Sequence, residues 1–130
     1  MNRKEIENLE DVKFLVDTFY AKIRKDDLLA DIFNGVIGDQ WSEHLQTMYT
    51  FWQTILLNER TYYGSPFPPH ANLPVEWRHF QRWLKLFHET IDEHYTGERA
   101  EEARWRSERM AEMFQARIQY FKERSTRPLI

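Results

Sequence analysis

Hydrophobic residues recur every three or four positions in four stretches of the chain, separated by short polar or proline-rich segments. This spacing places apolar side chains along one face of an α-helix. The first stretch predicts a helix over about 9–24, with Asn8 suited to accept a hydrogen bond from a free backbone N–H of the first turn. Its apolar face consists of Val12, Leu15, Val16, Phe19 and Ile23.

The second helix is expected after a short apolar piece that ends in Asn34-Gly35, a pair typical of turns. Asp39 is its predicted cap, because aspartate accepts hydrogen bonds from the free N–H groups of a first turn. The apolar face of this helix consists of Trp41, Leu45, Met48, Trp52, Ile55 and Leu56.

Two further helices complete the pattern. The third has Pro74 suited to its first turn and is expected to stop near Gly97. The last starts with the acidic Glu98 and ends with the basic Arg124, an order that suits the helix dipole, and residues 125–130 are expected to fray. The pattern predicts a single all-α domain over residues 1–130, with four substantial helices and short connectors.

The proline-rich segment 66–74 reads Pro-Phe-Pro-Pro-His-Ala-Asn-Leu-Pro and interrupts this helical pattern. Proline fixes its own φ and biases the preceding residue away from helix, so His70 lies on a short, stiff segment between two helices. A rigidly held histidine without a packing role is a candidate metal ligand.

Composition excludes several classes of function. The 130 residues suffice for one domain that buries about two thirds of its unfolded surface. The net charge of −3 gives no electrostatic reason to bind nucleic acid or an anionic membrane, and the lack of cysteine excludes thiolate chemistry. With no secretory signal and no apolar run of membrane-spanning length, we expect a soluble cytoplasmic protein.

Aromatic residues make up 15% of the chain: nine Phe, six Tyr and five Trp. They either fill the core themselves or line a cavity for a large planar ligand, and composition does not separate these alternatives.

Three further residues are candidates for a pocket. His44 lies one position off the apolar face of the second helix, either half exposed on its flank or at the mouth of a pocket. Tyr20 lies on the inner face of the first helix, either as a core residue or as a hydroxyl donor, and Trp83 of the third helix is explained by packing alone.

The remaining histidines suggest no site. Glu76 and His79 have the Glu-x-x-His spacing of carboxylate-bridged di-iron bundles, but a di-iron site needs two such motifs and this chain has one. His88 and His94 have acidic neighbours and are expected to be solvated.

Seven ordered blocks over about residues 10–95 resemble the group III truncated haemoglobins. They are Thr18-Phe-Tyr20-Ala-Lys-Ile-Arg24, Asp31-Ile-Phe33-Asn, Trp41-Ser-Glu-His44, Phe51-Trp52, Tyr63-Gly64, Pro69-His70-Ala-Asn-Leu73-Pro74 and Arg82-Trp83-Leu84-Lys-Leu-Phe87. The other two groups usually carry Gly-Gly pairs near their helix junctions, and this chain has none. The resemblance implies a two-over-two helical sandwich.

The same resemblance implies roles for individual residues around haem b. His70 would be the proximal ligand of the haem iron, and Tyr20, His44 and Trp83 would face the opposite, distal side. The residues that would line the rest of the haem pocket are Phe33, Met48, Phe51, Trp52 and Leu73.

An iron held by one histidine keeps its sixth position open to dioxygen or another diatomic ligand. Hydrogen-bond donors on the distal side predict high oxygen affinity and slow release. The alternatives are a small haem enzyme with peroxidase or nitric oxide dioxygenase activity, which would take electrons from a separate reductase, and a cofactor-free bundle with an aromatic core.

Overall fold

The computed structural model describes the backbone of residues 3–126 and the side chains of residues 3–124. The described helices are α1 (Leu9–Ile23), α2 (Ala30–Ile37), α3 (Trp41–Leu57), the 3-10 helix η1 (Pro68–His70), α4 (Trp77–His94) and α5 (Glu98–Thr126). The predicted all-α class is confirmed. Residues 125 and 126 continue α5, whereas 127–130, the rest of the predicted frayed tail, lie outside the described residues.

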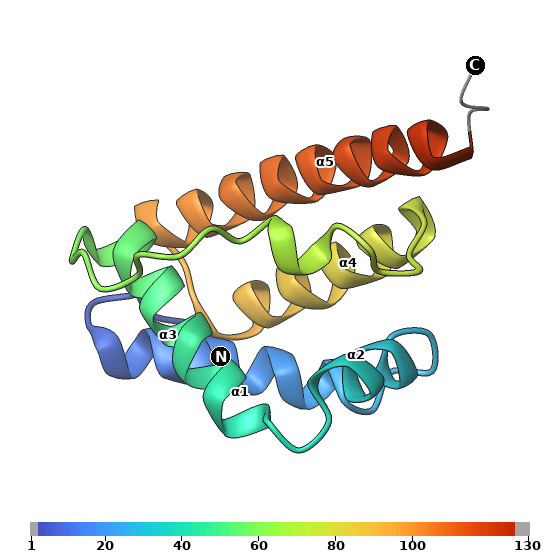
Figure 1. The fold of residues 1–130 in the computed structure, drawn as a ribbon. Coiled ribbons are helices and arrows are strands. Elements are labelled where there is room, and N and C mark those ends of the chain that lie inside the picture. The colour runs from blue at the N-terminus through green and yellow to red at the C-terminus, as the bar shows by residue number, and fades with distance from the viewer. Residues whose placement is uncertain (1–2, 127–130) are drawn as a thin grey trace.

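The helices form two packed layers (Figure 1). Helix α1 packs against α3 and α4, and α5 lies along α4 and also contacts α3. The long connection from α3 to α4 carries η1 (Figure 1). This arrangement brings segments from all parts of the chain around one interior space.

An aromatic cluster holds three of the helices together. Phe19 of α1 and Phe87 of α4 are fully buried, with ring centroids 5.0 Å apart. Trp52 of α3 stacks on Phe87 at 5.1 Å. Part of the aromatic excess therefore fills the core, as expected for large side chains that bury much apolar area.

The start of α1 and the end of α4 agree with the sequence. The side chain of Asn8 accepts a hydrogen bond from the backbone N–H of Asp11 at 3.1 Å, so the predicted cap is confirmed. Helix α4 ends at His94, and Gly97 adopts a positive φ of 98° before α5 begins. Glycine reaches this backbone conformation without steric cost.

The prediction of a turn at Asn34-Gly35 is wrong, because both residues lie inside α2. The side chain of Asn34 accepts a hydrogen bond from the indole N–H of Trp41 at 3.1 Å, which links α2 to α3. The chain turns instead at Gly38, with φ 61°, and the residue at the cap position of α3 is Gln40 rather than Asp39. A tertiary contact thus overrides a local turn signal.

The predicted position of Pro74 in the first turn of α4 is also wrong. The helix begins at Trp77, so Pro74 and Val75 precede it. The backbone N–H of Val75 donates to the carbonyl of Leu73 at 2.9 Å, and that of Glu76 donates to Nδ1 of His79 at 2.9 Å. These two hydrogen bonds hold the backbone of Val75 and Glu76 in a non-helical conformation, so α4 begins only after Glu76.

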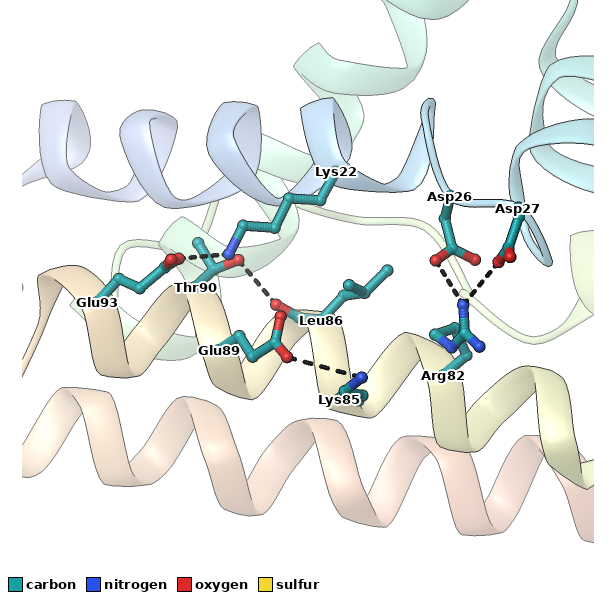
Figure 2. Close-up of polar contacts among 9 residues, drawn as sticks. All are labelled: Lys22, Asp26, Asp27, Arg82, Lys85, Leu86, Glu89, Thr90 and Glu93. Atoms are coloured by element: carbon teal, nitrogen blue, oxygen red, sulfur yellow. Dashed lines mark hydrogen bonds and ion pairs between the residues drawn. The ribbon is translucent and has the colours of Figure 1, made fainter.

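Polar contacts also join α1 to α4 (Figure 2). Arg82 of α4 binds Asp26 at 2.7 Å and Asp27 at 3.0 Å, just beyond the end of α1. Lys22 pairs with Glu93 further along the same seam. The Asp26 side chain is only 9% exposed and also accepts the backbone N–H groups of Leu28 and Leu29. Asp26 is therefore the best satisfied carboxylate of this seam.

We predict that Asp26 makes stability depend on pH at the acid end. Burial alone would raise the pKa of Asp26, but hydrogen bonds from Arg82, Leu29 and Leu28 outweigh it and hold the pKa below its ordinary value. Such a carboxyl stabilises the fold above its unfolded pKa of about 3.9, and this contribution is lost as the pH falls through the lower folded pKa. Asp26→Asn is expected to cost about 1 kcal/mol at pH 7.

The check is urea unfolding at a series of pH values. The difference between wild type and Asp26→Asn should shrink steadily below about pH 4. Asp27→Asn is the matched control, because the side chain of Asp27 is 91% exposed and its pair with Arg82 should contribute little. A difference independent of pH would contradict the prediction.

Candidate functional site

One apolar cavity lies between the helices. Its space, counted out to the open mouth and including solvent there, is about 930 Å³. The structure brings all nine residues predicted from the sequence together in its wall: Tyr20, Phe33, His44, Met48, Phe51, Trp52, His70, Leu73 and Trp83. The cavity therefore joins residues from α1, α2, α3, α4 and the segment around η1.

His70 ends the short helix η1, which begins with two prolines. Its Nδ1 lies 2.6 Å from the carbonyl oxygen of Pro66. A carbonyl oxygen only accepts hydrogen bonds, so Nδ1 carries the proton and donates it, which leaves the lone pair on Nε2. Nε2 has no hydrogen bond to another described residue. This is the tautomer of a histidine that binds a metal through Nε2.

Burial keeps this imidazole neutral. It lowers the pKa of His70, although the hydrogen bond to Pro66 acts in the opposite direction. The ring also packs against Phe114 of α5, with centroids 4.7 Å apart. Because Phe114 packs in turn against Phe67, next to η1, the orientation of His70 is fixed by packing as well as by its hydrogen bond.

Tyr20 is a buried residue of α1 whose side chain lines the cavity. Its ring meets the edge of Phe19 at 4.9 Å and of His44 at 5.0 Å. Burial raises the pKa of the Tyr20 hydroxyl, so the group stays protonated. Its hydroxyl makes no hydrogen bond to another described residue and is available as a donor.

His44 lies in the wall of the cavity, and its Nε2 is buried without a hydrogen-bond partner in the described part of the chain. Burial lowers the pKa of His44, and the nearby His70 lowers it further, so the ring is neutral at pH 7. A buried polar atom without a partner costs about 1–3 kcal/mol. Such an atom facing a cavity is explained if a ligand supplies the partner.

Trp83 of α4 completes the polar part of the wall. Its ring stacks on Phe87 at 5.4 Å and meets the edge of Phe19 at 5.2 Å. The tryptophan is thus held by the aromatic cluster of the core, which supports the packing interpretation, while the same residue borders the cavity. Trp83 is therefore packed in the core and is also a residue of the cavity wall.

The sequence did not single out half of the lining. The other residues in the wall are Leu29, Ile32, Pro66, Val75, His79, Phe80, Met110, Ala111 and Phe114. Three of them belong to α5, where the apolar spacing of Met110 and Phe114 signals a buried face without showing what that face contacts. His79 was set aside with the di-iron motif; its spacing from Glu76 instead belongs to the start of α4.

His88 and His94 were expected to be solvated, and both are half-buried, so they keep part of their contact with solvent. Nε2 of His88 lies 3.5 Å from a carboxylate oxygen of Glu108, because α5 covers this side of α4. His94 packs on the ring edge of Phe14 at 4.9 Å. Neither histidine lines the cavity.

Within residues 3–124, no three His, Asp or Glu side chains are arranged to hold a metal ion between them. In the same part of the chain, no helix combines the length and apolar character needed to cross a membrane.

Comparison with known proteins gives a consistent result. A family model described as bacterial-like globin matches residues 5–119. The chain is 38% identical over 112 residues to the group 3 truncated hemoglobin ctb of Campylobacter jejuni, covering 83% of this chain and 88% of that protein. The crystal structure of group III truncated hemoglobin from Campylobacter jejuni matches with a TM-score of 0.82 and 36% identity, over 90% of this chain and 95% of that one. The expected fold of a truncated globin is confirmed.

Proposed function

The chain belongs to the bacterial-like globins and, within them, to the group III truncated haemoglobins, and from this premise we propose that its cavity holds haem b with His70 as the iron ligand. The family implies a haem cofactor; its type and its ligand are the proposal. The observation that carries it is the hydrogen bond from Nδ1 of His70 to the Pro66 carbonyl, which leaves Nε2 free to coordinate.

The rest of the cavity suits the same group. A flat apolar macrocycle needs apolar walls, and Phe33, Met48, Phe51, Trp52 and Leu73 supply them. His44 lines the cavity, and its buried Nε2 lacks a hydrogen-bond partner that a bound group would supply. A haem pocket needs apolar side chains around the porphyrin and a small number of polar atoms near the iron, and this cavity offers both.

When bound, haem would supply an iron that can take a diatomic ligand such as dioxygen, and His70 would hold that iron. Tyr20 would donate its hydroxyl hydrogen to partial negative charge on a ligand held there, and the indole N–H of Trp83 is a second donor. His44 would add a third contact through Nε2. Donors in an apolar cavity favour a ligand that carries negative charge, so we infer high oxygen affinity and slow release.

Titration of the purified protein with haem, followed by visible absorption, tests this function. The proposal expects saturable binding of one haem per chain with an intense Soret band. A folded protein that stays colourless would contradict it and would favour the alternative of a cofactor-free bundle.

A second candidate function rests on His44. In the neutral tautomer that has its lone pair on Nε2 and its proton on Nδ1, the buried His44 can accept a proton, as peroxidase chemistry requires. Such an enzyme, or a nitric oxide dioxygenase, would draw electrons from a separate reductase. In the haem-loaded protein, His44→Leu should lower peroxide turnover by about a hundredfold if His44 moves this proton, and change oxygen affinity much less.

Stopped-flow measurements of peroxide consumption and of oxygen binding on the same samples separate the two functions. The matched control is His94→Leu, since His94 lies outside the cavity. If His44→Leu leaves the peroxide rate unchanged, oxygen binding is the better assignment.

A further inference from the structure

His79 is a histidine of the cavity wall to which the proposed function gives no role. It lies in the first turn of α4 and is only 7% exposed. Its Nδ1 accepts the backbone N–H of Glu76 at 2.9 Å. A backbone N–H only donates, so Nδ1 of His79 holds a lone pair and the proton of the neutral ring is on Nε2.

His79 and His70 therefore offer opposite groups to the same cavity. His70 is bonded to a carbonyl and keeps a free lone pair, whereas His79 is bonded to an N–H and keeps a free N–H. Coordination of a metal by Nε2 of His79 would require the other tautomer and would leave the Glu76 N–H without its acceptor. This N–H makes no hydrogen bond to another described residue, and the side chain that carries it lines the cavity.

The surroundings of His79 favour an anion. The free N–H groups of the first turn of α4 carry partial positive charge. Lys122 of α5 reaches this end of the cavity, where its Nζ donates to the carbonyl of Val75 at 2.9 Å. The carboxylate of Glu76 caps the first turn of α4 by accepting the backbone N–H of His79. It is exposed and pairs with Arg78 at 2.9 Å, so its charge is compensated. The neighbouring lining, Val75 and Phe80, is apolar.

We propose that the Nε2–H of His79 binds a carboxylate on the edge of the porphyrin and so fixes how the macrocycle is seated. The inference rests on the proposed function, because protoporphyrin IX carries two such carboxylates. A hydrogen bond to a charged acceptor contributes more than a neutral one, particularly where water is excluded. His79 is then a binding residue, and His70 alone supplies the iron ligand.

The test uses metal-free protoporphyrin IX and its dimethyl ester, which lacks both carboxylates, with tryptophan fluorescence quenching as the readout. Without iron, the bond to His70 plays no part. The measured quantity is the ratio of the two dissociation constants within one variant, which cancels any general damage to the cavity. We expect wild type to prefer the diacid and His79→Leu to lower that preference about tenfold.

His79→Glu is the second variant. A glutamate at this position of a helix can still accept the backbone N–H of Glu76, but it replaces the donor by a negative charge. It should lower the preference for the diacid at least as much as His79→Leu. Unchanged ratios in both variants would overturn the inference and leave the proposed function standing, whereas a wild type that binds neither these porphyrins nor haem would overturn both.

Discussion

A His70→Gly variant is expected to lose at least about a hundredfold in haem affinity, since even indirect disturbance of a metal ligand costs 10–100-fold. The substitution removes an imidazole that is held rigidly by η1 and whose Nε2 has a free lone pair. The neighbouring helices should persist, because their aromatic cluster lies apart from η1. Haem transfer to a scavenging globin, followed by absorption, measures the loss.

Added imidazole provides the control for this variant. Glycine leaves room for a free imidazole to occupy the place of the side chain, so millimolar imidazole should restore the wild-type spectrum. His94→Gly is the matched comparison, because His94 lies outside the cavity. Unaltered haem retention in His70→Gly would contradict the role proposed for His70.

The second large effect is expected for Tyr20→Phe in the haem-loaded protein. The substitution removes only the hydroxyl, a protonated donor at the cavity wall, and leaves the ring packed against Phe19 and His44. Loss of a hydrogen bond of about 1.4–2.8 kcal/mol corresponds to oxygen release about ten- to a hundredfold faster. Trp83→Phe should act in the same direction.

Oxygen release is followed by stopped-flow displacement with carbon monoxide. Tyr49→Phe is the matched control, because the hydroxyl of Tyr49 pairs with Asp17 on the surface, away from the cavity. Its rate should equal that of wild type. If neither Tyr20→Phe nor Trp83→Phe changes the rate, hydrogen bonding by these side chains does not control oxygen release.

The helices were predictable where one apolar face decides the structure. Repeated apolar positions identify α1, α3 and α4. The cap of α1 was predictable because the side-chain oxygen of Asn8 can accept a hydrogen bond from the first turn. The predicted turn at Asn34-Gly35 was wrong, because Asn34 lies inside α2 and accepts a hydrogen bond from Trp41. The local sequence does not show this contact between two helices. Local signals fix an element's presence better than its ends.

The site was predictable in its membership but not in its geometry. The family resemblance predicted nine residues that all line one cavity in the structure. Residue spacing does not predict that Nε2 of His44 is buried, or that Phe114 of α5 packs on the ring of His70. Those features arise from packing between helices far apart in the chain. The tautomers of His70 and His79 likewise depend on which backbone atom each Nδ1 meets.

An experimental structure of the haem-loaded protein tests the central claim most directly, because it shows which atom binds iron. The account predicts one macrocycle in the cavity, with Nε2 of His70 bonded to iron and its Nδ1 still hydrogen-bonded to the Pro66 carbonyl. Iron bonded instead to His44 or His79, or a haem held elsewhere on the surface, would contradict it.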